Sequence, residues 1–203
     1  MRGLQPRSPS QIARQNRVNV PGLVGAIWQP LYDFQTYANG GVASQRFFSV
    51  PRGQGGKTEQ DTNMELSGQI PKGQKFDITG IEVAFYPGGT ILSAAANEYA
   101  DDIREVYQNG ALDLVIGSRS FCLQAPLGKF PPTAHMEVDA ASTAAGESIS
   151  FAYPIGREYA TVNMELVSNQ NFSVLLTGLP ALPSGVDGRI GVTLNGFLYR
   201  NAQ

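Results

Sequence analysis

The sequence predicts an all-β protein, an antiparallel β-sandwich with one inserted helix and an extended N-terminal arm. Apolar residues alternate with polar ones over many short stretches, which is the period of a half-buried strand. The 23 glycines and 13 prolines among 203 residues supply the turns that many short strands require. One stretch, residues 97–108, has instead the period of an amphipathic helix.

The bulk composition narrows the class of protein. A chain of 203 residues with 42% hydrophobic residues can fill the core of one domain. Its formal net charge of −2 does not suit a protein that coats nucleic acid. The single cysteine, Cys122, excludes a disulfide framework and a Cys-rich zinc site. No run of 18 apolar residues occurs, and the arginines near the N-terminus adjoin no hydrophobic segment, so we expect neither a membrane span nor a secretory signal, and synthesis in a cytoplasm.

The composition of residues 1–29 predicts an arm, which precedes a single sandwich domain at residues 30–203. The arm has three prolines, four arginines and no acidic residue, and it shows no sustained period. A disordered tail is the alternative, but residues 18–28 are too apolar for a tail that stays in water. We expect this segment to dock on its own subunit or on the next one. The expected assembly residues are Val20, Leu23, Val24, Ile27 and Trp28.

Residues 44–50 and 62–70 predict two strands around a glycine-rich loop. Gly-Gly-Lys-Thr at residues 55–58 resembles the end of a phosphate-binding P-loop. The first glycine of that motif would fall on Pro51, however, and no apolar helix follows to hold a phosphate. We therefore expect a flexible loop without bound phosphate.

The next two elements are a strand and the helix. Residues 75–86 predict a strand with a bulge at residues 79–80, because its apolar positions change from even to odd numbers there. Residues 97–108 predict the helix, with Asn97 as a candidate N-cap, acidic residues in its early turns and Asn-Gly as its stop. The acidic residues Asp101 and Asp102 are interpreted as charges that the helix dipole favours.

Residues 111–125 predict a β-hairpin with a two-residue turn at Gly117-Ser118, since glycine suits the first central position of a type II′ turn. Alternation and turn predict the same register on a buried face. This register pairs Ile116 with Arg119, Leu114 with Phe121, and Leu112 with Leu123.

A long connection through His135 leads to a strand at residues 149–153 and a second hairpin at residues 159–177. A three-residue loop, 168–170, would place Leu166 opposite Phe172, Met164 opposite Val174, and Val162 opposite Leu176. The last predicted strand is 188–199, where Ile190, Val192, Leu194 and Leu198 share one face.

The side chains that enzymes and metal centres need are scarce. A hydrolytic triad requires an imidazole, and His135 is the single histidine of the chain. One histidine cannot supply a cupin-type metal centre, and Cys122 lies within a predicted strand, where a buried thiol is the common case. Nothing singles out two of the strand glutamates as a glycosidase pair. We therefore expect no enzymatic activity, no cofactor and no metal.

The order of elements, some nine strands with one inserted helix, resembles a jelly-roll β-sandwich. It is similar to the structural proteins of icosahedral bacterial viruses, in which an N-terminal arm precedes the sandwich. Three features carry this resemblance: the acid-free arm 1–29, the neutral-polar faces around residues 61–64, and the short C-terminal strand ending at 196–200.

The resemblance implies a virion structural protein, a capsid subunit or a cement or decoration protein, made in the host cytoplasm. Its partners would be copies of itself, as a trimer or pentamer, and other virion proteins. The arm departs from genome-binding capsid proteins because it has four arginines and no lysine. Such an arm implies at most weak, salt-sensitive contact with nucleic acid. The candidate contacts are Arg2, Arg7, Arg14 and Arg17.

Two other functional classes stay open. A carbohydrate- or receptor-binding sandwich would need exposed aromatic residues on one face, and an enzyme on a β-sandwich is disfavoured by the single histidine. Along the sequence the candidate aromatic residues are scattered rather than clustered. They are Trp28, Tyr32, Tyr37, Tyr86, Tyr99, Tyr107, Tyr153 and Tyr159.

Overall fold

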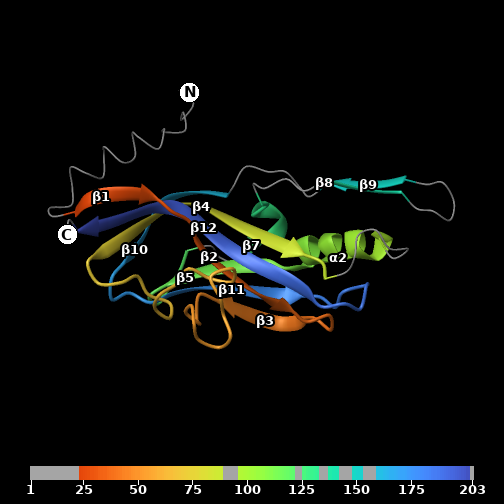
Figure 1. Ribbon diagram of the computed structural model, residues 1–203, viewed down its shortest axis with the longest axis horizontal. Helices are drawn as coiled ribbons and strands as arrows, with labels where there is room; N and C mark the ends of the chain where they lie inside the picture. Colours follow the sequence, from red (N-terminus) through yellow and green to blue (C-terminus); the bar gives the residue numbers. More distant parts are fainter. Residues whose placement is uncertain are drawn as a thin grey trace, which may run out of the picture.

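The computed structural model describes residues 23–88, 96–121, 125–132, 137–141, 148–152 and 159–201. Within this part, two antiparallel sheets pack against each other, and one α-helix lies at one end of them (Figure 1). The prediction of an all-β sandwich with one inserted helix is confirmed. Sequence-predicted residues that fall outside the described part are Arg2, Arg7, Arg14, Arg17, Val20, Cys122, Leu123, His135 and Tyr153.

The first sheet is organised around the long C-terminal strand β12. This strand pairs with β4 on one side and with both β1 and β2 on the other, and β10 pairs with the far side of β4. The strands are β1 (Leu23–Trp28), β2 (Leu31–Tyr37), β4 (Gln74–Tyr86), β10 (Tyr159–Val167) and β12 (Gly188–Asn201).

β1 and β2 lie end to end along the same edge of β12. Trp28 faces Phe197 and Leu31 faces Leu194, so the register continues without a shift from one strand to the next. The N–H of Gln29, between the two strands, donates to Gly196 O at 3.2 Å. Residues 26–37 therefore form one long edge of the first sheet.

The second sheet has the order β3, β11, β5, with β6 and β7 along the outer side of β5. Its strands are β3 (Val42–Phe47), β5 (Ala111–Ile116), β6 (Arg119–Ser120), β7 (Ala125–Pro126) and β11 (Phe172–Leu179). The buried faces of the two sheets form one hydrophobic core. Its largest fully buried side chains include Phe47, Phe76, Phe85, Ile81, Leu112, Leu114 and Leu176.

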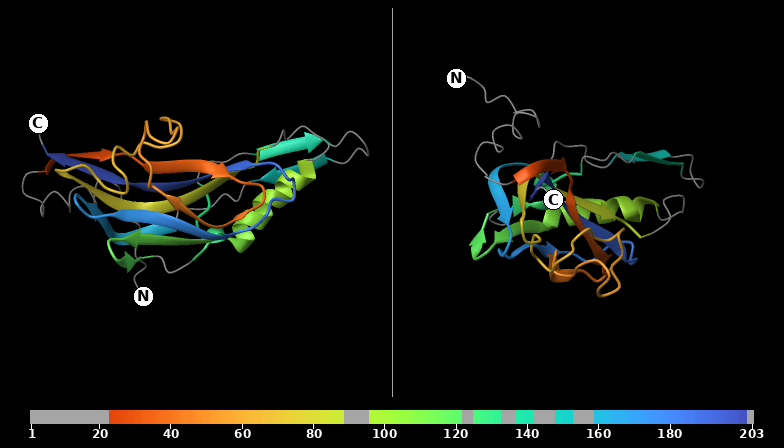
Figure 2. Two further views of the ribbon diagram at one scale, coloured as in Figure 1. Left: turned by 90° about the horizontal axis from the view of Figure 1, so that it is seen from below. Right: turned by 60° about the vertical axis from the view of Figure 1, so that its left-hand side comes forward.

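Helix α2 (Ala96–Asn109) packs at the end of the sandwich, where Figure 2 shows it crossing beside the strand ends. Ile103, Val106 and Tyr107 form its buried face, and the Tyr107 hydroxyl donates to Val83 O at 2.7 Å. This confirms the predicted helix, although it begins at Ala96, before the candidate N-cap. A 3₁₀ helix, η1 (Leu127–Lys129), and a two-stranded ribbon, β8 (Glu137–Ala141) with β9 (Ser148–Ala152), complete the described elements.

The strands pair in a nested order. β2 pairs with β12, β3 with β11, β4 with β10, and β5 with β6, so early strands meet late ones and the innermost pair is a hairpin. From β2 to β5, and again from β10 to β12, successive strands alternate between the two sheets. The chain is thus wound around the core as one long folded-back hairpin.

This winding makes the predicted hairpin at residues 159–177 wrong. β10 joins β4 in the first sheet, whereas β11 lies between β3 and β5 in the second. Neither Met164 nor Leu166 therefore faces the residue that we predicted for it. The turn carries the chain from one sheet to the other, and Asn169 in it has a positive φ of 69°. Alternation reports which face is buried and says nothing about which strand lies alongside.

The predicted hairpin at Gly117 is correct near its turn and wrong beyond it. Ile116 faces Arg119, and Gly117 has the positive φ, 63°, that the predicted turn requires. β6 ends at Ser120, however, and Leu112 pairs with Ala125 instead of Leu123. Phe121 still donates its N–H to Leu114 O, but its side chain is 41% exposed because the chain leaves the strand there.

The predicted bulge in β4 is confirmed. Gly80 faces Asn195 while Ile78 faces Gly196, so Thr79 is the extra residue that reverses the buried phase.

The strand predicted at residues 62–70 is wrong. That segment has only isolated bridges, including Asp33 with Thr62, although Met64 and Ile70 are buried as the alternation suggested. Its polar groups bond to the edge of β2 instead of extending a sheet. The strand predicted at 44–50 is observed as β3, which begins two residues earlier and ends three residues earlier, and Phe48 with φ of 65° follows its end.

Candidate functional site

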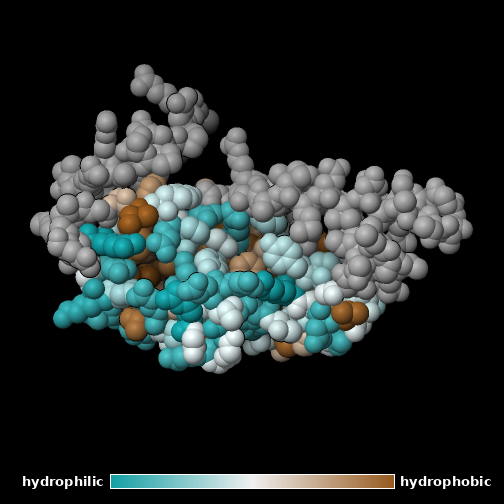
Figure 3. All heavy atoms as spheres, in the orientation of Figure 1, coloured by the Kyte–Doolittle hydropathy of each residue, from teal (hydrophilic) through white to brown (hydrophobic). Residues whose placement is uncertain are grey.

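The described part of the predicted assembly segment, residues 23–28, lies at the edge of the first sheet. Leu23 and Val24 belong to β1, and the side chains of Ile27 and Trp28 are 41% and 51% exposed. Residues 23–28, which the sequence predicts as part of the arm, are thus a strand of the sandwich, because β12 extends far enough to pair with them. Brown, hydrophobic atoms gather over the β1 region at the left of Figure 3, on a face that is otherwise mostly teal and white.

Trp28 is held on the outer face of this sheet by an aromatic neighbour. Its ring meets that of Phe197 edge-on, with centroids 5.1 Å apart, in the cross-strand position directly opposite. Phe197 is buried while Trp28 stays half open to solvent. The tryptophan therefore has a fixed position and an uncovered surface, as an interface residue would have.

Backbone groups along this edge point alternately toward β12 and away from it, as in any antiparallel ladder. Gln29 donates its N–H to β12, so the odd-numbered residues of the edge direct their backbone N–H and C=O groups toward β12. The even-numbered residues, from Ala26 to Thr36, direct their N–H and C=O groups outward. Such groups are a template for another strand unless something covers them.

Residues 57–63, which we call the capping loop, cover the outward groups of β2. The N–H of Tyr32 donates to Asn63 Oδ1 at 3.1 Å, and the N–H of Phe34 donates to Asp61 O at 2.7 Å. Thr62 Oγ1 donates to Tyr32 O at 2.9 Å, and Asn63 Nδ2 donates to Pro30 O at 2.7 Å. The edge of β2 is therefore closed to other strands.

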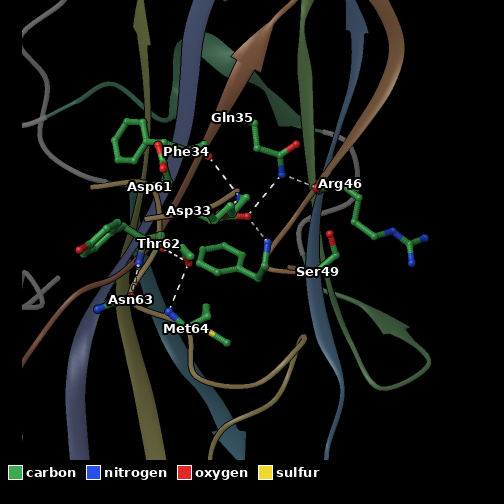
Figure 4. Close-up of polar contacts among 12 residues, drawn as sticks. Asp33, Phe34, Gln35, Arg46, Ser49, Asp61, Thr62, Asn63 and Met64 are labelled. Carbon is green, nitrogen blue, oxygen red and sulfur yellow. Dashed lines mark hydrogen bonds and ion pairs between the residues drawn. The ribbon is translucent and has the colours of Figure 1, made fainter. Parts of the chain in front are cut away.

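A buried ion pair anchors this loop to β2. The carboxylate of Asp33 has no exposed surface, and it accepts hydrogen bonds from Lys57 Nζ and from the N–H of Phe48, the latter at 2.6 Å. Lys57 Nζ also donates to Phe34 O at 3.2 Å, and Gln35 Nε2 lies 3.4 Å from Asp33 Oδ2. Figure 4 shows Asp33 at the centre of these polar contacts. The lysine that resembled part of a P-loop thus has a structural role.

The covering stops at Pro30. Among the residues that the structure describes, no hydrogen bond reaches the outward groups of Ala26 or Trp28. Pro30 itself stands at an outward position, where its missing N–H costs the sheet nothing. One part of the edge is therefore capped, at residues 30–34, and the other, at residues 26–28, is open.

A second candidate site lies on the outer face of the same sheet. The ring of Phe34 stacks on that of Tyr86 with centroids 6.2 Å apart, and the ring centroid of Tyr32 lies 6.3 Å from that of Phe34. Arg189 places its guanidinium 4.8 Å from the centre of the Phe34 ring and pairs with Asp61 at 2.9 Å. All three rings are half-buried, so each leaves part of its surface to solvent.

Phe34 lies close over the backbone of β12 at Gly191. A Cβ at that position would lie 2.1 Å from Cδ1 of Phe34, so only glycine leaves room for the ring there. The aromatic residues that are scattered in the sequence are thus brought together in part. Tyr32 and Tyr86 join this group, whereas Trp28 and Tyr159 lie elsewhere along the sheet.

A charged group sits beside the C-terminal end of β12. Lys75 Nζ lies 3.0 Å from Asp77 and 2.9 Å from Glu165, and 5.7 Å from the centre of the Tyr199 ring. Burial raises the pKa of Asp77, although the hydrogen bond from Lys75 opposes this. Burial also disfavours the charged form of Lys75, but hydrogen bonds to Glu165 and Asp77 raise its pKa above the ordinary value. Lys75 thus links its own strand, β4, to β10 through Glu165 and to β12 through Tyr199, which is a structural role.

Asp102 has a different role from the one that we predicted. It is fully buried, and it accepts hydrogen bonds from the N–H of Ser184 at 3.0 Å and from its hydroxyl at 2.6 Å. This contact fixes the connection between β11 and β12 on the helix. Burial, together with the charge of Asp102, raises the pKa of the Tyr37 hydroxyl, which donates to Pro180 O at 2.6 Å. Asp101, by contrast, pairs with Arg104 on the helix surface.

Within the described ranges, no cluster of three or more histidine, cysteine or acidic side chains is arranged to hold a metal ion. The same part of the chain contains no helix long and apolar enough to cross a bilayer. Comparison of the chain with the models of known protein families, with curated proteins and with solved structures found no match. The geometry of the two candidate surfaces is therefore the basis for any functional argument.

Proposed function

We propose that this chain is a non-enzymatic virion structural protein, a capsid subunit or a cement or decoration protein, that assembles through its N-terminal arm and sandwich surfaces. The observation that carries the proposal is the nested strand order. A pairing of first with last, second with next-to-last and so inward is what a jelly roll requires, and viral capsid proteins are among the proteins built on that architecture.

The surfaces support the same proposal. The predicted assembly segment ends in a strand, β1, in which the side chains of Ile27 and Trp28 are exposed, and apolar surface of this kind is covered in assembled proteins. The arm that precedes it is acid-free, so its charge is complementary to a chain whose total is −2. Because one fold can serve many functions, assembly itself is the property that tests the proposal.

The test compares the full chain with two truncations. The full chain should form a trimer, pentamer or closed particle, seen by light scattering and electron microscopy. Deletion of residues 1–22 should leave a folded sandwich that no longer assembles into particles. Deletion of residues 1–28 should also expose the edge of β12 and lower stability, because β1 is a strand of the first sheet. A full chain that stays monomeric at every concentration would contradict the proposal.

The second candidate function is a carbohydrate- or receptor-binding sandwich, favoured by the aromatic group on the outer face. Tyr32, Phe34 and Tyr86, with Arg189 beside them, present ring surfaces and a cation of the kind that bind sugar rings and their acidic groups. Binding to a glycan array should then be lost in Phe34→Ala. Phe121→Ala is the matched control, because Phe121 is an exposed aromatic residue that follows β6 of the other sheet.

A further inference from the structure

We infer that the open part of the edge, residues 26–28, pairs with the same residues of a second copy of this chain, antiparallel and across a two-fold axis at Ile27. The inference rests on the proposed function, because it names the partner of one assembly surface. It follows from three properties of β1: its outward backbone groups, its side chains, and the residues on either side of it, which exclude other positions of the axis.

The outward backbone groups of β1 in one copy are complementary to those of β1 in a second copy. Ala26 and Trp28 both direct N–H and C=O away from β12, while Ile27 between them faces β12. An axis at Ile27 places Ala26 opposite Trp28 of the second copy, and Trp28 opposite its Ala26. Each of these pairs then exchanges both of its N–H···O bonds, as the hydrogen-bonded pairs of an antiparallel ladder do. All the open groups of this stretch are thereby used.

The side chains suit the same arrangement. The strand Leu23–Trp28 contains no charged residue, so two copies meet without like-charge repulsion. On the outer face, the large ring of Trp28 comes to lie beside the small side chain of Ala26 of the second copy. On the opposite face the two Ile27 side chains face each other. Pairing thus covers the two exposed apolar side chains of β1.

Other positions of the axis leave groups unpaired. An axis at Trp28 would place Ala26 opposite Pro30, which has no N–H and whose C=O already accepts from Asn63. An axis at Ala26 would place Trp28 opposite Val24, where the register between β1 and β12 is interrupted. The axis at Ile27 is therefore the one that the strand favours.

A disulfide tests this register in the full-length chain. In the variant Ile27→Cys with Cys122→Ser, the two new thiols belong to a non-hydrogen-bonded pair whose Cα atoms lie about 4.5 Å apart. This separation is within the range that a disulfide bridges, about 4.4–6.8 Å. Mild oxidation should therefore convert most chains to a linked dimer, seen on a non-reducing gel.

The matched control is Ala26→Cys with Cys122→Ser. Two such residues are displaced by two positions along the paired strands, which separates their Cα atoms by about 8 Å. We expect roughly ten-fold less linked dimer, because disulfides do not form beyond about 7 Å. Equal linking in both variants, or none in Ile27→Cys, would overturn the inference.

A proline variant tests the same pairing without introducing a thiol. Ala26→Pro removes an outward N–H while sparing the hydrogen bonds between β1 and β12, as Pro30 does in the native chain. It should weaken two-fold association in light scattering and leave the far-ultraviolet dichroism unchanged. Thr36→Pro, at an outward position of β2 that lies away from residues 26–28, should not change association.

Electron microscopy separates the inference from the proposed function. If particles form while Ile27→Cys does not link, the virion proposal stands and the pairing is wrong. If Ile27→Cys links selectively and no condition yields particles or closed oligomers, the pairing stands and the virion proposal is wrong.

Discussion

Replacement of Lys57 by methionine should lower the free energy of unfolding by about 3–5 kcal/mol, because it leaves a charge buried without its partner. Asp33 has no exposed side-chain surface, and Lys57 is only 12% exposed, so solvent cannot compensate the loss. The carboxylate would keep two hydrogen-bond donors, the N–H of Phe48 at 2.6 Å and Gln35 Nε2 at 3.4 Å. Neither of these donors carries a charge.

A double-mutant cycle identifies the charge as the cause. Asp33→Asn combined with Lys57→Met removes both charges, and the amide oxygen can still accept from Phe48. We expect the double variant to be more stable than the sum of the single losses by about 1–3 kcal/mol. The assay is urea unfolding followed by the fluorescence of Trp28, the single tryptophan of the chain.

The control for this cycle lies at the same loop. Arg52→Met removes an ion pair with Glu59 whose side chains are 48% and 81% exposed, and it should cost less than about 1 kcal/mol. Two results would refute the reasoning: a Lys57→Met loss as small as this control, or single losses that add within about 0.5 kcal/mol.

The remaining predictions concern the core, the helix anchor and pH. Leu114→Ala should destabilise the fold by about 2–5 kcal/mol, because Leu114 is fully buried, whereas Phe121→Ala should cost less than about 1 kcal/mol, as urea unfolding can show. Asp102→Ala should cost about 1.5–3 kcal/mol in the same assay, through loss of its buried hydrogen bonds, and an unchanged midpoint would contradict its anchoring role. Hydrogen bonds from the N–H and hydroxyl of Thr58 hold the pKa of Asp61 below its ordinary 3.8. The ionised carboxylate therefore stabilises the fold at pH values above 3.8, and this stabilisation is lost as the pH falls through the lowered pKa. Asp61→Asn should therefore lower stability at neutral pH, and its difference from the native chain should vanish in acid.

The sequence by itself determined the local features of this protein. The bulge at Thr79 follows from a change in apolar phase within one strand, and the turn at Gly117 follows from the φ that glycine tolerates. The helix follows from one periodic stretch with its own start and stop residues. Each of these depends on residues that are near one another along the chain, so a pattern of a few residues is enough to predict it.

Only the tertiary structure decided which strands are neighbours. The pattern of residues 159–177 fits a hairpin as well as it fits two strands in different sheets, because both arrangements bury the same alternate side chains. The polar alternation at residues 62–70 likewise does not distinguish a sheet strand from a loop that caps the edge of β2. The choice depends on contacts between distant segments, which local propensity does not encode.

The candidate site shows the same division. The apolar character of Ile27 and Trp28 was sufficient to predict a docking segment, but not that β12 would hold it as a strand with one open side. The pairing of Asp33 with Lys57, and the gathering of Tyr32, Phe34 and Tyr86, join residues from separate strands and loops. No spacing in the sequence signals them, because backbone winding, and not chain distance, brings these side chains within contact of one another.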